Sequence, residues 1–223
     1  MNKTVVLIPA RGESKRLPNK NILPLGGIPL LAHSIRYAQA NSSFIDSIYV
    51  TTDNQEIKKV ALEFGAQVID RPQNLSGDFE PTISSLQHAL SVLDTNFENV
   101  ILLQPTNPLR PENLLIDCFE KFKNTNCQSL FTVSPTHNKL GKLVGEKFEP
   151  FNYEIGQRSQ DLEPLYFENG LLYIVKAATI KQGKIITEDA FPYVVNHLFA
   201  KIDIDTQDDF DFAEYLYSKI KKL

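Results

Sequence analysis

The sequence predicts an α/β fold with a mostly parallel sheet flanked by helices. Up to Val133, short apolar runs alternate with segments of helical periodicity, and this alternation is typical of βαβ units. The apolar runs are hydrophobic at consecutive positions, as strands are when helices cover both faces of a parallel sheet. With 223 residues, the chain suits one domain with a full core. We therefore expect a single Rossmann-like domain over residues 1–223.

Local signals place the first elements. Thr4–Ile8 is continuously apolar and predicts a central strand. Pro29–Ala40 is the first expected helix, because proline suits a position where the backbone N–H would be unpaired anyway. Asp46–Thr52 is the second expected strand, and Asp53 and Asn54 can cap the helix that follows it.

The later elements alternate in the same way until the pattern breaks after Val133. Gly65 suits the position just beyond the end of the second helix. We expect further elements at Gln67–Ile69 (strand), Thr82–Leu93 (helix), Val100–Leu103 (strand), Pro111–Lys123 (helix) and Ser129–Val133 (strand). Residues 134–165 hold prolines, glycines and short apolar pieces, which indicate an inserted β-rich segment. The last elements are expected at Leu165–Val175 (strand), Phe199–Ile204 (strand) and Asp208–Ile220 (amphipathic helix).

Composition excludes several classes of function. Hydrophobic residues make up 42% and charged residues 22% of the chain, as in an ordinary soluble globular protein. A net charge of −4 offers no overall basic field to nucleic acid. No apolar run approaches the roughly 20 residues of a membrane helix. The N-terminus shows no signal-peptide pattern, and Cys118 and Cys127 lack C-x-x-C spacing. We expect a cytoplasmic protein with reduced thiols and no nucleic-acid or membrane partner.

The loop after the first strand is basic and predicts phosphate binding. It carries Arg11, Lys15, Arg16 and Lys20 directly after Pro9 ends the apolar run. Backbone N–H groups and cations at the carboxyl end of a parallel strand are the usual means by which α/β sheets hold phosphate. The loop matches neither the P-loop nor the G-x-G-x-x-G pattern. A solvated surface loop stays the alternative, and the sequence leaves open whether Lys15 and Arg16 face the site.

Two aspartates near the C-terminus predict a metal site. Asp203 and Asp205 are two positions apart at the end of the last expected strand, so their side chains should lean to the same face. Two carboxylates at such a place suit Mg²⁺, which also takes phosphate oxygens. The alternative is an exposed acidic face. That is what we expect of Asp208, Asp209 and Asp211 at the start of the last helix.

Three motifs resemble those of one enzyme family. A-R-G-E-S-K-R-L-P-N-K-N at residues 10–21 is similar to the A-R-x-x-S-K-x-L-x-x-K-N signature of the CMP-sialic acid synthetases, or acylneuraminate cytidylyltransferases. L-Q-P-T-N-P-L-R at residues 103–110 resembles that family's L-Q-P-T-S-P-L-R, and I-D-I-D-T at residues 202–206 resembles its terminal acidic motif. The resemblance implies transfer of CMP from CTP to a nonulosonic acid, with release of pyrophosphate.

The resemblance also implies roles at the nucleotide. It assigns nucleotide binding to Arg11, Ser14, Lys20, Asn21, Arg71 and Thr82. In catalysis, Arg11 and Lys20 would stabilise the leaving pyrophosphate, and Asp203 and Asp205 would hold Mg²⁺. The stretch Phe79-Glu80-Pro81 departs from the small residues that the family has there, which leaves the details of the base pocket open.

The acceptor side departs further from the family. The resemblance assigns acceptor binding to Gln104, Arg158, Gln160, Asn169 and Tyr173. Ser159 and Phe167 replace arginines that sialate enzymes often carry, so the acid itself stays open among sialic, legionaminic, pseudaminic and octulosonic types. In the family the inserted segment packs across a homodimer and helps to complete the partner's acceptor site. We expect the same of residues 134–165.

Two other functions stay open at this point. The first is a related nucleotidyltransferase that acts on Kdo or on a sugar phosphate. The second is a nucleotide-binding protein without catalysis, although the basic loop and the paired aspartates are both intact. The sequence contains no G-x-S-x-G motif and no Cys/His pairing that would support a hydrolase.

Overall fold

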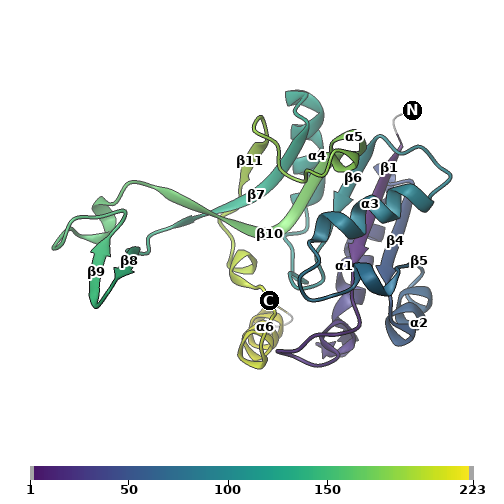
Figure 1. The fold of residues 1–223 in the computed structure, drawn as a ribbon, viewed down its shortest axis with the longest axis horizontal. Helices are drawn as coiled ribbons and strands as arrows, with labels where there is room; N and C mark the ends of the chain where they lie inside the picture. The colour runs from purple at the N-terminus through teal and green to yellow at the C-terminus, as the bar shows by residue number, and fades with distance from the viewer. Residues whose placement is uncertain (1–2, 221–223) are drawn as a thin grey trace.

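The computed structural model describes residues 3–220, so residues 1–2 and 221–223 of the predicted domain lie outside the described part. The main sheet contains β1 (Thr4–Pro9), β4 (Ser47–Thr52), β5 (Gln67–Asp70), β6 (Asn99–Leu102), β7 (Ser129–Thr136), β10 (Leu165–Lys176) and β11 (Phe191–Val194). Their order is β11-β7-β10-β6-β1-β4-β5 (Figure 1). β10 is antiparallel to β6 and β7, and the other neighbouring pairs are parallel. The predicted mostly parallel sheet is confirmed.

Helices cover both faces of this sheet. They are α1 (Leu30–Ala40), α2 (Gln55–Glu63), α3 (Thr82–Val92), α4 (Leu114–Thr125) and α5 (Ala177–Lys181), whereas α6 (Gln207–Ile220) packs in a separate cluster with Ile202 and Ile204. Val6 and Ile8 of β1 pack in one core cluster with residues of α1, α2 and α4. Val5 and Leu7 pack in a second cluster with residues of α3 and α5. Two covered faces explain why the strand is apolar at every position.

Most expected elements are present within a residue or two of their predicted ends. Asn54 caps α2 by accepting hydrogen bonds from the N–H groups of Glu56 at 2.9 Å and Ile57 at 3.0 Å. Gly65 follows α2 with a φ of +82°, a left-handed conformation that favours glycine. α5, β11 and the short hairpin of β2 (Pro24–Leu25) with β3 (Ile28–Pro29) were not expected from the sequence.

The strand predicted at Phe199–Ile204 is wrong. A 3₁₀ turn, η5 (Leu198–Lys201), takes its first part, and the rest is extended chain outside the sheet. The N–H of Ile204 donates to the carbonyl of Thr106 at 2.8 Å, in a loop rather than in a neighbouring strand. Buried and more exposed side chains still alternate along this segment, because Ile202 and Ile204 are buried in a third cluster against α6. Asp203 and Asp205 therefore both lie on the opposite side of this extended segment.

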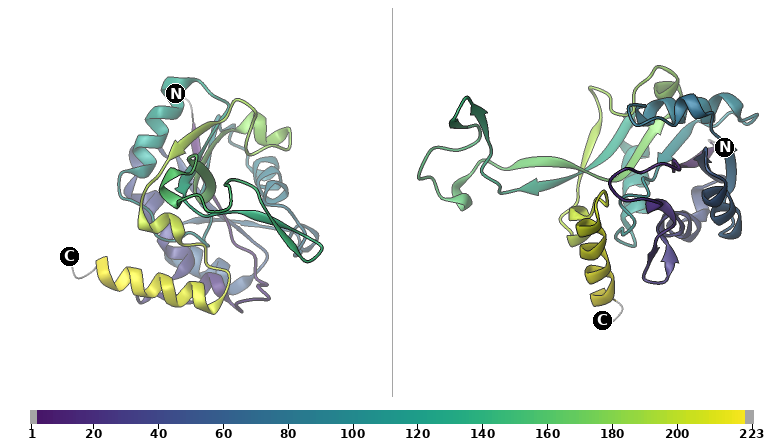
Figure 2. Two further views of the ribbon diagram at one scale, coloured as in Figure 1. Left: turned by 90° about the vertical axis from the view of Figure 1, so that its left-hand side faces the viewer. Right: turned by 60° about the horizontal axis from the view of Figure 1, so that its bottom comes forward.

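The inserted segment forms an arm, which we define as residues 137–164. β7 and β10 carry it away from the sheet, and β8 (Gly141–Val144) pairs with β9 (Lys147–Pro150) near its end. Figures 1 and 2 show the arm reaching out from the body of the molecule. The short 3₁₀ turn η4 (Ser159–Asp161) lies on its return path. Within residues 3–220, no helix is both long and apolar enough to cross a membrane.

Candidate nucleotide-binding and catalytic site

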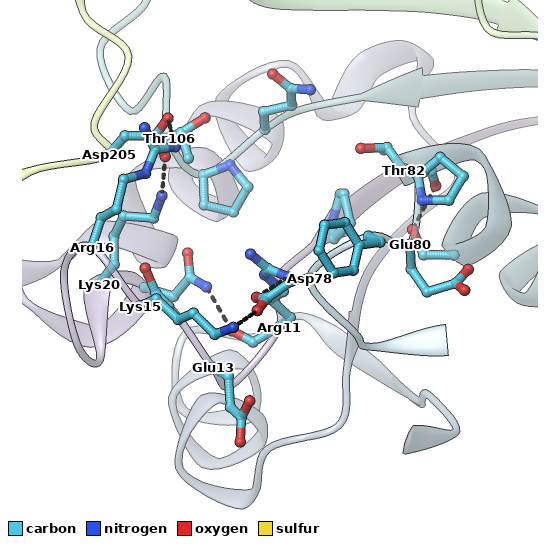
Figure 3. Close-up of a pocket in the computed structure, with 18 of the residues that line it drawn as sticks. Arg11, Glu13, Lys15, Arg16, Lys20, Asp78, Glu80, Thr82, Thr106 and Asp205 are labelled. Carbon is cyan, nitrogen blue, oxygen red and sulfur yellow. Dashed lines mark hydrogen bonds and ion pairs between the residues drawn. The ribbon is translucent and has the colours of Figure 1, made fainter. Parts of the chain in front are cut away.

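A cavity of about 640 Å³ lies at the carboxyl ends of β1, β5 and β6 (Figure 3). Parallel α/β sheets place their ligand sites at this edge, because the loops that leave neighbouring strands meet there. The structure brings most of the predicted site residues together in its lining, namely Arg11, Ser14, Lys20, Asn21, Arg71, Thr82, Gln104, Asp203 and Asp205. Residues from segments that are far apart in the sequence thus line one cavity.

One group of charges in the cavity, the Asp78 cluster, consists of Arg11, Lys15 and Asp78. Asp78 Oδ1 lies 3.0 Å from Arg11 Nη1, and Asp78 Oδ2 lies 2.5 Å from Lys15 Nζ. The hydrogen bond from Lys15 and the two neighbouring cations hold the pKa of Asp78 below its usual range, and Asp78 raises the pKa of Lys15. Lys15, whose direction the sequence left open, therefore faces the site.

A second group, the Asp205 cluster, consists of Arg16, Lys20 and Asp205. Lys20 Nζ lies 2.8 Å from Asp205 Oδ1, and Arg16 Nη2 lies 2.5 Å from Asp205 Oδ2. The Lys20 side chain is buried, whereas Arg16 is exposed. In each cluster one carboxylate bridges two cations, so each carries a formal charge of +1 and can take phosphate oxygens.

The backbone of the basic loop is held by groups at its ends. Asn21 Nδ2 donates to the carbonyl of Arg11 at 3.0 Å. The N–H of Gly12 donates to Asp53 Oδ1 at 2.9 Å, so Asp53 holds this loop in place. The N-cap of α2 is Asn54 and not Asp53. These hydrogen bonds hold the backbone of the loop from which the cationic side chains of both clusters extend.

Arg71 is a buried cation whose guanidinium group is only partly satisfied by the described residues. Its Nε and Nη2 atoms find no hydrogen-bond acceptor within residues 3–220, and Nη2 lies 3.9 Å from Asp53 Oδ1. Burial lowers the pKa of Arg71, while the charge of Asp53 opposes that shift. Because buried donors without acceptors are costly, these two atoms favour a ligand with acceptor oxygens in the cavity.

Thr82 and Gln104 line the cavity from a helix start and a strand end. Thr82 is the first residue of α3, and the first turn of a helix offers unpaired N–H groups and a positive dipole end. Gln104 follows β6 and lies next to Thr106 in the lining. Both positions are compatible with the nucleotide and acceptor roles that the resemblance implies.

Asp203 and Asp205 present two carboxylates that could hold a magnesium ion. Both line the cavity on the side opposite to the buried Ile202 and Ile204. The part of the chain that the structure describes holds no group of three or more acidic, histidine or cysteine residues suited to a metal. Mg²⁺ is commonly held by only one or two carboxylates together with water and phosphate oxygens. The donor chemistry of the pair therefore fits a magnesium nucleotide.

Asn107 is a residue that the sequence did not single out, and it fixes the aspartate segment. Its buried Nδ2 donates to the carbonyl of Ile202 at 2.7 Å and to that of Asn169 at 3.1 Å. The motif of the CMP-sialic acid synthetases has serine at this position. This difference from the motif is the feature of the sequence that could have drawn attention to Asn107. Asn107 thereby ties the loop after β6 to the residue before Asp203 and to the irregularity in β10.

Arg110 and Asp209 also support the site from behind. The buried guanidinium of Arg110 donates to the carbonyls of Leu171 at 2.6 Å and Gln104 at 2.8 Å. Burial lowers the pKa of Arg110 to about 10, so it stays charged at neutral pH. Asp209, expected to be a plain surface charge, accepts hydrogen bonds from the N–H groups of Asp205 and Thr206.

The remaining acceptor candidates lie outside this cavity as residues 3–220 form it. The Asn169 amide bonds to Thr132 Oγ1 at 2.5 Å and Ser134 Oγ at 2.9 Å, so it supports the strand pair β7–β10. Tyr173 donates to Glu168, and burial, that bond and the charge of Asp203 all raise the pKa of Tyr173.

Arg158 and Gln160 lie on the arm, where both side chains are exposed. Arg158 Nε donates to Asp161 Oδ2 at 2.7 Å. Neither residue lines the cavity of its own chain, and the arm that carries them reaches away from the body of the molecule (Figure 2). Their acceptor role stays a prediction.

Comparisons with known proteins agree with this geometry. The sequence model of a family described as cytidylyltransferase matches residues 5–222. The chain is 36% identical to the CMP-N,N'-diacetyllegionaminic acid synthase of Legionella pneumophila, over 96% of each chain. It is 32% identical to a pseudaminic acid cytidylyltransferase of Campylobacter jejuni, again over 96% of each. It is also 32% identical to the N-acylneuraminate cytidylyltransferase of Streptococcus agalactiae, over 93% of this chain and 52% of that one.

A solved structure shares the fold at lower identity. A CMP:2-keto-3-deoxy-manno-octonic acid synthetase complexed with CTP matches with a TM-score of 0.72 and 16% identity, over 98% of this chain and 99% of that chain. The family match spans the basic loop, the segment after β6 and the paired aspartates alike. The chain therefore belongs to the cytidylyltransferase family, with the CMP-sialic acid synthetases among its relatives.

Proposed function

We propose that this protein transfers CMP from CTP to the anomeric hydroxyl of a nonulosonic acid and releases pyrophosphate. The observation that carries the proposal is the cavity in which two cation clusters and a pair of aspartates meet. Relatives that match over 96% of this chain are named for pseudaminic and legionaminic acids. They support an acidic keto-sugar of this class as acceptor.

The reaction is an in-line displacement at phosphorus. The anomeric oxygen of the acceptor forms a bond to the α-phosphorus, the bond from that phosphorus to the pyrophosphate oxygen breaks, and the hydroxyl proton leaves to solvent. Most of the barrier reduction in such a transfer comes from positioning and from charge stabilisation. Lys20 and Arg11 supply the charge, because both can exchange a carboxylate partner for oxygens of the departing pyrophosphate.

Charge balance supports a requirement for magnesium. The cavity lining carries five cations, Arg11, Lys15, Arg16, Lys20 and Arg71, and five carboxylates, Glu13, Asp78, Glu80, Asp203 and Asp205. Its formal charge is zero, so a bare triphosphate would meet little net attraction. Asp203 and Asp205 would hold Mg²⁺, which when bound neutralises triphosphate charge and lowers the pKa of the attacking hydroxyl.

We further propose that the protein is a homodimer built through the arm. Large apolar side chains are exposed there, with Leu143 80% and Ile155 86% accessible. Several large apolar side chains exposed on one segment favour an interaction site there. Arg158 and Gln160 sit on the same arm, away from their own cavity, so a second copy would bring them toward the partner's acceptor. A cytoplasmic location fits the supply of CTP.

The test is pyrophosphate release from CTP and Mg²⁺ over a panel of acceptors. N-acetylneuraminate, legionaminate, pseudaminate, Kdo and a sugar phosphate are each supplied at the same concentration. We expect release with one of the nine-carbon acids, which would also identify the substrate. Release only with Kdo or the sugar phosphate would contradict the proposed acceptor class. If no acceptor gives pyrophosphate release while calorimetry shows CTP binding, a nucleotide-binding protein without catalysis would be favoured.

A further inference from the structure

Phe79 lies in an environment unusual for a large apolar residue. Its side chain lines the cavity and is 99% exposed. Ile83 and Leu86, a few residues further along, pack in the core instead. An aromatic ring left in water forgoes hydrophobic stabilisation, so its display at the mouth of a cavity favours a ligand that covers it.

The backbone that carries Phe79 is anchored rather than loose. The N–H of Glu80 donates to the carbonyl of Gly77 at 3.2 Å and closes a tight turn, with Asp78 and Phe79 at its tip. The same carbonyl accepts from Arg11 Nη1 at 3.0 Å. Asp78 is further held by the ion pairs of its cluster. The ring is therefore presented from a turn that is fixed to the basic loop.

The layout of the cavity indicates which part of a nucleotide meets this turn. Figure 3 shows the Asp205 cluster on one side of the cavity and Glu80 and Thr82 on the other, with Arg11 and Asp78 between them. A triphosphate is drawn to the cations of the two clusters. Its nucleoside is then left to the side formed by the Phe79 turn and the start of α3.

We propose that Phe79 stacks on the cytosine ring of bound CTP and closes that side of the cavity. The inference rests on the function proposed above and assigns the aromatic contact to a residue of this particular chain. Every base has a π-face, and stacking on an aromatic side chain strengthens nucleotide binding by roughly 5- to 150-fold. The contact fixes the base, while the clusters fix the phosphates.

Calorimetric titration with two ligands separates these contributions. CTP and ribose 5-triphosphate share the phosphates and the sugar, and only CTP has a base. We expect Phe79→Ala to raise the Kd for CTP about tenfold and to leave the Kd for ribose 5-triphosphate unchanged. Phe79→Leu, which keeps apolar bulk without a π-face, should fall between the two. Phe212→Ala, which removes a partly exposed phenylalanine of α6, is the matched control and should change neither value.

A fluorescent variant provides an independent readout. The chain contains no tryptophan, so Phe79→Trp carries a single reporter. Its emission should change on addition of CTP and stay constant with ribose 5-triphosphate. Equal CTP affinities of the wild type and Phe79→Ala, or equal weakening of both ligands, would overturn the stacking and leave the proposed function standing. Failure of the wild type to bind CTP at all would overturn the proposed function together with this inference.

Discussion

Replacing Asn107 by alanine should loosen the segment that carries the two aspartates. The substitution removes the donors to the Ile202 carbonyl at 2.7 Å and to the Asn169 carbonyl at 3.1 Å, in a place where Asn107 is only 1% exposed. A buried carbonyl left without a donor costs about 1–3 kcal/mol. Two such carbonyls predict a decrease of about 2–6 kcal/mol in the free energy of unfolding.

The same variant should need more magnesium. Residues that position metal ligands typically contribute about 10–100-fold to metal affinity, so we expect half-saturation with Mg²⁺ in pyrophosphate release to rise about tenfold. Urea unfolding at equal protein concentration measures the stability. Asn99→Ala is the control, because it removes a buried asparagine at the far end of β6, which bonds to Lys176 Nζ at 3.0 Å. It should cost stability and leave the magnesium requirement unchanged.

Two outcomes would refute this reasoning. If Asn107→Ala unfolds within about 0.5 kcal/mol of the wild type, as surface substitutions usually do, the two hydrogen bonds do not hold the segment. If it loses stability while its magnesium requirement matches that of Asn99→Ala, Asn107 supports the fold alone and does not position Asp203 and Asp205.

Three further predictions concern the metal, the arm and pH. Asp203→Asn should reduce turnover at least about 100-fold while calorimetry still detects CTP; near-normal turnover would remove the metal assignment. Replacing Leu143 and Ile155 together by aspartate should yield monomers in sedimentation velocity, because both side chains are exposed in the single chain; an unchanged dimer would place the interface elsewhere. Burial opposes ionisation of Asp209, but hydrogen bonds from Thr206 and Asp205 outweigh it and lower the pKa of Asp209. This stabilisation is present above the unfolded pKa of about 4 and is lost as the pH falls through the lower folded value. Asp209→Asn should therefore be less stable than the wild type at neutral pH, and the difference should vanish in acid unfolding series; a difference independent of pH would contradict the linkage.

The central strands and their helices could be predicted because their signals are local. A strand covered on both faces is apolar at every position, and Asn54 and Gly65 mark the ends of α2 by their own chemistry. β11 was missed because Pro192 interrupts it, and proline is confined to edge strands such as this one. The segment at 199–204 was misread because alternation shows which residues are buried and says nothing of a pairing partner.

The site was predictable to the extent that its residues are contiguous in the sequence. The basic loop between β1 and α1 is one such run, and the structure places its cations around the cavity. The partners of those cations are distant, since 185 positions separate Lys20 from Asp205 and 66 separate Arg11 from Gly77. Contacts between residues so far apart in the sequence depend on the tertiary fold. The sequence therefore could not show that Asp78 and Asp205 each form ion pairs with two cations of the basic loop.

The central claim is that this cavity forms a phosphodiester between CMP and an acidic keto-sugar. Phosphorus-31 NMR of a reaction with CTP, Mg²⁺ and the nine-carbon acceptor tests it most directly, because it distinguishes the phosphodiester of a CMP-sugar from the monoester of free CMP. We expect the phosphodiester and pyrophosphate to appear in equal amounts as CTP disappears. Appearance of CMP in place of the phosphodiester, or CTP that persists with every acceptor, would contradict the account.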